Sequence, residues 1–388
     1  MQKKTVKFNP RTFFSTLFGK TRNKKEIELD AYQIKFFRWQ ADEGGFKDWT
    51  FDSVEYGLEG TLKLSADALR SEDGILTGEM LSPVLETPFD IATAVPSWNV
   101  DAPEGSWVNV SLRVKTADVW TRWYTLGIWS QSNDPSDRHS VKGQEDDLVE
   151  IATDTLLLKT GVISRSVQMK IQLNARSDSQ YPVVNGAALV LNDSHKKNVS
   201  LSQGDPKLWN KTLPVPPYSQ MVYPDGGNVW CSPTSVSMIL SFWQDYKGLP
   251  EAVVRESVAG VYDPVYEGTG NWSFNTAFAA TKGLTAAVGR LASLEQAEKF
   301  ISAGIPLALS VSWKPGELTG APVEKSDGHL IVLTGFDARG NPVVNDPAAK
   351  EDAQVRRVYE RAELERIWRF TSGGIVYIIT PIGITWPV

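Results

Sequence analysis

The sequence predicts two domains, an all-β sandwich of jelly-roll type followed by an α+β domain. Its 388 residues exceed a typical single domain of roughly 100–200 residues. From Glu26 to Asp193 apolar and polar residues alternate, as in half-buried strands, whereas helical and strand patterns mix after Pro214. The predicted parts are a basic tail (1–25), the sandwich (26–193), a linker (194–213) and the α+β domain (214–388).

Two long alternating segments carry the prediction of the sandwich. Val108 to Lys115 and Val167 to Asn174 each place apolar side chains on one face and polar ones on the other. Clusters of Gly, Pro, Ser and Asp separate them from further strand candidates. These candidates are residues 60–65, 122–129, 155–158 and 187–191. Many short strands with turn residues between them favour an antiparallel sandwich.

The predicted sandwich is rich in tryptophan. The residues are Trp39, Trp49, Trp98, Trp107, Trp120, Trp123 and Trp129. This arrangement resembles galactose-binding-like or lectin-like sandwiches, in which exposed aromatic rings stack on sugars. The resemblance implies a carbohydrate or cell-surface ligand for this domain. The alternative is that these large side chains form its core.

The α+β domain begins after a polar linker and the extended segment Pro214-Val-Pro-Pro217. Ser293-Leu-Glu-Gln296 is a capping box that predicts a helix ending near Gly304. The remaining predictions are a strand over 305–311, a charged helix over 361–369 and a final core strand over 374–379.

The single cysteine, Cys231, lies where a loop becomes a helix. Val236, Ile239, Leu240 and Trp243 follow it at helical spacing, and Pro233 suits a first turn. Exposed amides and the positive end of the helix dipole favour a thiolate there. Cys231 is therefore a candidate nucleophile, although a lone cysteine is also common as a small buried apolar residue.

The chain has three histidines, of which His139 and His195 fall in polar segments typical of loops. His329 instead opens an apolar run, bounded by glycines, that predicts a buried strand. A turn and a short second strand follow and end at Asp346. The predicted hairpin returns this carboxylate to the neighbourhood of His329, where it can orient the imidazole. Taken singly, His329 and Asp346 also fit a core residue and a turn.

The ordered set Gln220, Cys231, His329 and Asp346 resembles the papain-like cysteine peptidases, specifically the family of bacteriocin-processing peptidases. The phrases Trp230-Cys-Ser-Pro-Thr-Ser, Gly270-Asn-Trp-Ser-Phe-Asn275, Asp327-Gly-His329 and Asn345-Asp-Pro347 carry it. It covers the chain from about Pro214 onward. The resemblance implies that Cys231 is the nucleophile, His329 the general base and then acid, Asp346 the orienting carboxylate, and Gln220 an oxyanion-hole donor. Trp230 and Trp272 are candidate substrate contacts.

Three functions fit these residues. The leading one is a thiol-dependent hydrolase that cleaves a peptide or other amide bond, with the sandwich as a binding or targeting domain. The second is an acyl transferase or transpeptidase with the same triad, because an amine can capture an acyl-enzyme as water does. The third is a non-enzymatic carbohydrate- or surface-binding protein with an inert peptidase-like domain.

Composition excludes several other classes. The net charge of −6 argues against a nucleic-acid partner, and no apolar run reaches the ~18 residues of a membrane span. No cysteine cluster, His-Glu-x-x-His motif or phosphate-binding glycine loop occurs, so no metal and no cofactor are expected. Basic residues from Lys3 to Lys25 form a membrane-surface anchor or a solvated tail, not a convincing signal peptide. The single cysteine fits a bacterial protein outside the cytoplasm or at the cell surface, and it fits a cytoplasmic protein too.

Overall fold

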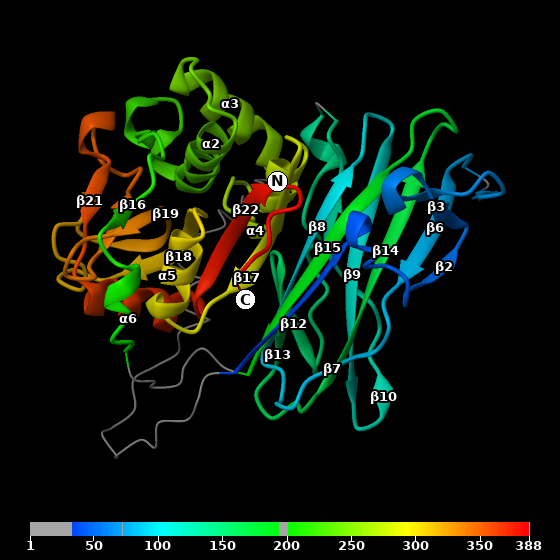
Figure 1. Cartoon of the computed structure of the whole chain (residues 1–388). Helices are drawn as coiled ribbons and strands as arrows, with labels where there is room; N and C mark the ends of the chain where they lie inside the picture. The colour runs from blue at the N-terminus through cyan, green and yellow to red at the C-terminus, as the bar shows by residue number, and fades with distance from the viewer. Residues whose placement is uncertain (1–32, 72, 133, 194–200, 388) are drawn as a thin grey trace, which may run out of the picture.

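The computed structural model describes residues 33–71, 73–132, 134–193 and 201–387. The predicted basic tail (1–25) and the first part of the predicted linker lie outside these residues. Figure 1 shows two β-rich parts side by side, a sandwich built from the first half of the chain and a mixed domain built from the second half. The predicted all-β sandwich followed by an α+β domain is confirmed. No helix in the described ranges is long and apolar enough to cross a membrane.

The sandwich consists of two antiparallel sheets. Within the described residues, sheet A has seven strands, which are β1 (Ile34–Gln40), β3 (Val54–Tyr56), β4 (Leu62–Leu64), β8 (Thr93–Asp101), β12 (Val149–Ala152), β13 (Thr155–Leu158) and β15 (Val183–Asn192). Sheet B has eight there, which are β2 (Thr50–Asp52), β5 (Leu69–Arg70), β6 (Leu76–Leu81), β7 (Leu85–Glu86), β9 (Ser106–Thr116), β10 (Val119–Trp120), β11 (Tyr124–Trp129) and β14 (Ser166–Ala175).

The two segments with the clearest alternation form the centre of sheet B. Strands β9 and β14 pair over ten residues, from Ser106 opposite Ala175 to Lys115 opposite Ser166. Their apolar residues are buried between the sheets, and the polar residues between them lie on the outer face. A shift of one residue would reverse both faces, so this pattern fixes the register.

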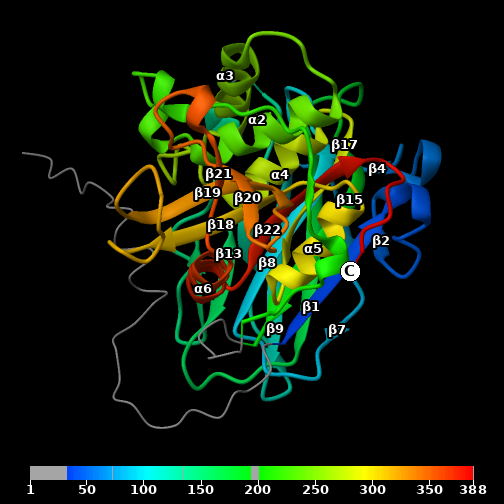
Figure 2. The ribbon, with the colours of Figure 1, turned by 60° about the vertical axis from the view of Figure 1, so that its left-hand side comes forward.

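The second domain packs helices against a third sheet. In the described part of the chain, sheet C has seven strands, which are β16 (Lys211–Thr212), β17 (Leu284–Arg290), β18 (Leu307–Trp313), β19 (Ser326–Phe336), β20 (Pro342–Asn345), β21 (Arg356–Val358) and β22 (Ile375–Pro381). The helices are α2 (Cys231–Trp243), α3 (Pro250–Val261), α4 (Trp272–Ala280), α5 (Leu294–Ser302) and α6 (Arg361–Ser372). In Figure 2, α6 lies on the opposite side of this sheet from α2. The predicted cap of α5 is confirmed, since Ser293 accepts a hydrogen bond from the Gln296 amide.

Sheet A packs directly against the second domain. Strand β17 lies at the edge of sheet C, and β8 of the sandwich runs beside it. Asn99 donates to the Ala286 carbonyl (2.6 Å) and accepts from the Ala286 amide (3.1 Å), while Ser97 accepts from the Val288 amide. Side chains of the sandwich thus satisfy the exposed backbone of an edge strand.

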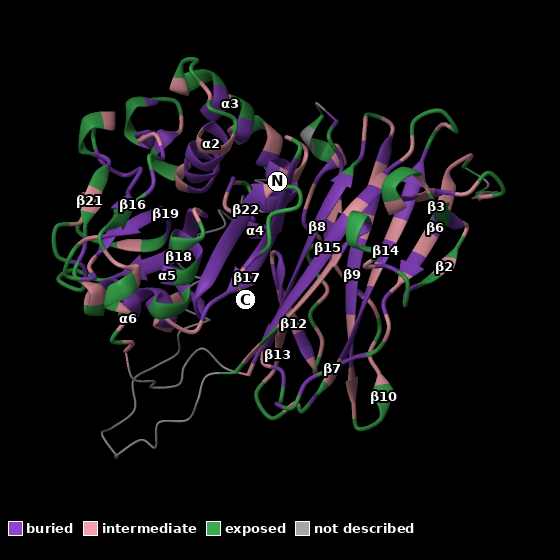
Figure 3. Ribbon diagram, in the orientation of Figure 1, coloured by how far each residue is buried: buried purple, intermediate pink, exposed green. Residues whose placement is uncertain are grey.

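Aromatic packing closes one end of the same interface. Phe274 of α4 is fully buried and contacts two sandwich tryptophans, with ring centroids 6.1 Å from Trp98 and 5.5 Å from Trp129. A side chain at Gly127 would meet both the Trp98 and Phe274 rings, so glycine is needed there. Figure 3 shows buried residues on both sides of the interface. The two domains therefore share one continuous core.

Candidate active site

The candidate nucleophile begins a buried helix, as predicted. Cys231 is the first residue of α2 and is half-buried, while the residues from Ser232 to Ser241 are buried. Ser235, one turn further on, donates a hydrogen bond to the Leu330 carbonyl of β19 (3.1 Å). Because Leu330 follows His329, this bond fixes the position of Cys231 relative to the histidine.

The predicted hairpin brings His329 and Asp346 together. His329 lies on β19, and Asp346 follows the end of β20. The His329 Nε2 and Asp346 Oδ1 atoms are 2.7 Å apart, and both side chains are buried. Trp313 of β18 packs edge-on against the imidazole at 5.6 Å between ring centroids. The ring is therefore held on two sides.

Charge interactions favour the protonated form of His329. Burial alone would lower its pKa, but the Asp346 carboxylate and a hydrogen bond with Cys231 outweigh burial and raise the pKa to about 10. Burial likewise opposes ionisation of Asp346, but its pKa is lowered by His329 and by hydrogen bonds from Tyr359 and Ala348. Since Nε2 faces Asp346, the nitrogen left for Cys231 is Nδ1.

Gln220 lies in a compact loop that contacts both the segment after Asp346 and the residues before Cys231. Its amide donates to the Pro347 carbonyl (2.9 Å), directly after Asp346. Its Nε2 donates to the Gly227 carbonyl (2.6 Å), and the side chain is buried. Two short 3₁₀ helices (Gln220–Val222 and Gly227–Val229) make this loop compact. The Nε2 group carries a second hydrogen, which this bond does not use.

The two tryptophans expected to contact substrate differ in exposure. Trp230 is half-buried immediately before Cys231, and its ring packs on Tyr223 at 5.7 Å between centroids. Trp272 begins α4 and is only 8% exposed, so little of its ring is available to a ligand.

The sequence did not indicate two residues that are far from the site in the chain but contact it in the structure. The Tyr359 hydroxyl donates to the second oxygen of Asp346 (2.6 Å), which leaves the carboxylate fully bonded. Asp154, from the β12–β13 turn of the sandwich, is fully buried and accepts hydrogen bonds from the Trp272 and Ser273 amides of α4. No spacing in the sequence indicates either contact, because each arises from the fold.

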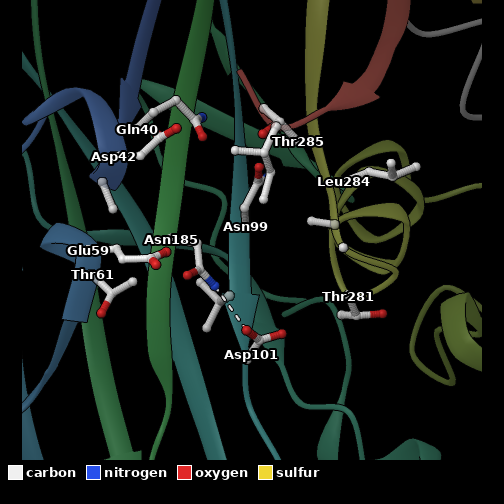
Figure 4. Close-up of a pocket in the computed structure, with 15 residues that line it drawn as sticks. Gln40, Asp42, Glu59, Thr61, Asn99, Asp101, Asn185, Thr281, Leu284 and Thr285 are labelled. Carbon is white, nitrogen blue, oxygen red and sulfur yellow. Dashed lines mark hydrogen bonds between the residues drawn. The ribbon is translucent and has the colours of Figure 1, made fainter. Parts of the chain in front are cut away.

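A separate cavity lies between the domains. Its volume is about 310 Å³, and its lining comes from the sandwich, the end of α4 and β17. Figure 4 shows the carboxylates of Asp42, Glu59 and Asp101 around it, with Asn185 donating to Asp101 (3.0 Å). None of the four candidate catalytic residues lines this cavity.

The sandwich tryptophans divide into two groups. Trp49, Trp98 and Trp129 are buried in the core. The remaining ones are half-buried, and three of them belong to sheet B or its connections. Trp120 and Trp123 both contact the Arg113 guanidinium at about 4.5 Å from the ring centroids, and Trp107 lies near Arg176.

Comparisons with known families cover both domains. Residues 37–192 match the peptidase C39 N-terminal domain, and residues 212–376 match the peptidase C39-like family. A search of the curated proteins found no match.

Similar solved structures include peptidases and a carbohydrate-binding module. A putative C39-like peptidase from Bacillus anthracis is 18% identical, with a TM-score of 0.31, over 44% of this chain and 98% of that chain. A prointerpain A fragment from Prevotella intermedia is 12% identical, with a TM-score of 0.30, over 49% and 78%. A xylan-binding module is 12% identical, with a TM-score of 0.23, over 41% and 97%.

Because these TM-scores are low, the family of each domain is assigned from the two family models together with the fold. The models match the sandwich and the α+β domain in turn, in the order in which the structure shows them. Residues 37–192 are thus a peptidase C39 N-terminal domain, and residues 212–376 are a domain of the peptidase C39-like family.

Proposed function

We propose that this protein hydrolyses a peptide or other amide bond through Cys231, His329 and Asp346, with a thioester acyl-enzyme as the intermediate. One observation carries the proposal. His329 is hydrogen-bonded to Asp346, and although burial opposes it, the charges of Asp346 and Cys231 raise the pKa of the ring to about 10, which keeps it protonated at neutral pH. A protonated imidazole beside a thiol is the arrangement that a nucleophilic thiolate requires.

In the acylation step, the Cys231 thiolate attacks the carbonyl carbon of the substrate. Gln220 Nε2 and the Cys231 amide donate to the oxygen that becomes negative. When the tetrahedral intermediate collapses, the C–N bond breaks and His329 gives its proton to the departing amine. The products of this step are a free amine, a thioester on Cys231 and a neutral His329.

In the deacylation step, neutral His329 takes a proton from water, and the hydroxide attacks the thioester. The C–S bond breaks, an acid leaves, and the thiolate–imidazolium pair is restored. An amine in place of water would give transfer instead of hydrolysis. The products of cleavage therefore distinguish the hydrolase from the transferase.

The test combines thiol reactivity with a search for substrates. Cys231 should react with iodoacetamide at pH 6 much faster than a free thiol, because a free thiol is almost fully protonated there. A synthetic peptide library analysed by mass spectrometry should show cleavage that is lost in Cys231→Ala. Slow alkylation together with no cleavage would favour the non-enzymatic binding protein.

For the sandwich we propose carbohydrate binding on the outer face of sheet B. The half-buried Trp107, Trp120 and Trp123 support this, because aromatic rings beside polar side chains suit sugar rings. On a glycan array, Trp107→Ala and Trp123→Ala should each weaken any binding that the wild-type chain shows. If both variants bind as wild type does, this surface is not the site.

A further inference from the structure

Three tyrosines surround the proposed triad, and they differ in their hydrogen bonds. Tyr359 donates to Asp346, and the Tyr377 hydroxyl is bonded to Ser232 Oγ (2.9 Å). The Tyr266 side chain is half-buried, yet its hydroxyl has no hydrogen-bond partner among the described residues. The hydroxyls of Tyr359 and Tyr377 are thus used in bonds within the protein, whereas the Tyr266 hydroxyl is available to donate a hydrogen bond.

The loop over residues 263–271, here called the Tyr266 loop, is joined to the start of the helix that carries Cys231. The Tyr266 ring folds back over its own loop, where a Cβ at Gly270 would lie 3.2 Å from the hydroxyl oxygen. Thr269, next to Gly270, donates to the Val229 carbonyl (3.2 Å), two residues before Cys231. The glycine leaves room for the ring, and the threonine joins the loop to the start of α2.

The electrostatic surroundings agree with this placement. Burial, followed by the charges of Asp154, Cys231 and Asp263, raises the pKa of Tyr266 to about 12. The hydroxyl is therefore protonated at any working pH and can donate a hydrogen bond. The main-chain carbonyl oxygens of a peptide accept hydrogen bonds and cannot donate them. A protonated tyrosine hydroxyl is therefore a suitable donor to a peptide carbonyl.

The sandwich holds one end of the Tyr266 loop. The Asp263 carboxylate is fully buried and accepts from the Ser140 amide of the sandwich (3.1 Å). The same carboxylate accepts from the Tyr266 amide (3.1 Å) and from Asn271 Nδ2 (3.1 Å). Arg138, also from the sandwich, donates to the Ala259 carbonyl (2.8 Å) just before the loop.

Asp154 of the sandwich holds the other end. It accepts from the Trp272 and Ser273 amides, and Asn271 accepts from the Phe274 amide (3.1 Å). These are the first amides of α4, which no residue within the helix can satisfy. One domain thus supplies part of the cap for a helix of the other.

We propose that the Tyr266 hydroxyl donates a hydrogen bond to a main-chain carbonyl of the peptide bound at Cys231, and that the sandwich, through Asp154 and Ser140, positions the loop that carries it. This inference rests on the proposed peptidase function. Under it, the N-terminal domain is part of the peptide-binding site. Tyr266 is a substrate-binding residue, and Asp154 is a positioning residue that acts through it.

The first test is Tyr266→Phe, which removes only the hydroxyl. With the best peptide from the library, kcat/KM should fall about 3- to 10-fold, mainly through a higher KM, as expected for one neutral hydrogen bond. Alkylation of Cys231 by iodoacetamide should stay at the wild-type rate. The matched control is Tyr262→Phe, which removes a hydroxyl from a partly exposed tyrosine just before the loop.

Unchanged kcat/KM in Tyr266→Phe would show that the hydroxyl does not contact the substrate. An equal fall in alkylation would show that it acts on the thiol and not on the peptide. Either result overturns the inference and leaves the peptidase intact. If the wild type cleaves no peptide at all, the proposed function fails, and the inference fails with it.

The second test asks whether the sandwich acts through Tyr266. Asp154→Ala should raise KM, and combining it with Tyr266→Phe should add little further loss, because residues acting through one contact are not additive. Asp154→Asn keeps an acceptor oxygen and should restore most of the activity. Full additivity would contradict the positioning role. If Asp154→Ala does not fold, Asp263→Ala serves in the same double-mutant cycle, with the same expected result.

Discussion

At the residue scale, the proposed site depends on one imidazole with two different neighbours. Asp346 occupies Nε2, and Tyr359 and the Ala348 amide occupy the remaining positions on the carboxylate. A buried carboxylate bonded in this way stays ionised and keeps His329 protonated. The proposed catalytic ring is thus held by Asp346 and Tyr359, whose side chains are both buried.

Asp346→Asn should therefore move the alkaline limit of activity. The wild-type ring loses its proton, and with it the general acid, as the pH rises through about 10. Removing the neighbouring charge should lower this limit by about 1–3 pH units. By linkage, the raised pKa stabilises the fold fully below pH 6.5, and this contribution is lost as the pH rises through about 10.

The measurement for Asp346→Asn is kcat/KM against pH, with circular dichroism to check the fold at each pH. Glu150→Gln, a partly exposed carboxylate on β12, is the control and should leave the profile unchanged. An alkaline limit that stays in place in Asp346→Asn would mean that another group sets it.

At the element scale, the loop before α2 decides where Gln220, the proposed oxyanion donor, lies. Gly227 is packed so closely that a Cβ there would come 1.9 Å from the Gln220 carbonyl oxygen. Its own carbonyl accepts from Gln220 Nε2. The glycine is thus required for the position of the glutamine, not for flexibility.

Gly227→Ala should displace Gln220 and lower kcat strongly. Gln220→Ala gives the reference loss, since the loss of one oxyanion donor lowers kcat by about 10²- to 10³-fold. Gly227→Ala should show a similar loss, with Cys231 alkylation retained in both variants. Asn228→Ala changes an exposed neighbour and should keep wild-type kcat. Normal turnover in Gly227→Ala would show that Gln220 is not an oxyanion donor.

At the scale of the whole molecule, the two domains behave as one folding unit. The edge strand β17 bonds to Ser97 and Asn99, and Phe274 lies among tryptophans of the sandwich. Without the sandwich, the second domain would expose the free edge of β17 and the aromatic ring of Phe274. Such a surface promotes aggregation.

Calorimetry should accordingly record a single unfolding transition for both domains. Phe274→Ala should lower the free energy of unfolding by about 3–5 kcal/mol. It should also shift the whole transition and not split it. Val119→Ala, at a residue that is 68% exposed, should change stability by less than about 0.5 kcal/mol. Two separate transitions in the wild type would contradict the shared core.

Strong local patterns made much of the fold predictable. Alternation over 108–115 and 167–174 is a property of consecutive residues, and it located β9 and β14. The capping box at Ser293 and the helical spacing after Cys231 are also local, and both helices begin where predicted. The α3 and α4 helices and strand β17 were not predicted. In α4 the residues from Trp272 to Ala279 are all buried, so they show no amphipathic period.

The sequence by itself determined the order of the two domains, the helix that begins at Cys231, and the hairpin that joins His329 to Asp346, because each depends on residues close together in the chain. Only the tertiary structure decided which atoms of those side chains meet, that Tyr359 completes the environment of Asp346, and that Asp154 of the sandwich caps α4. Such contacts join residues far apart in sequence, and they form only when both domains pack around one core.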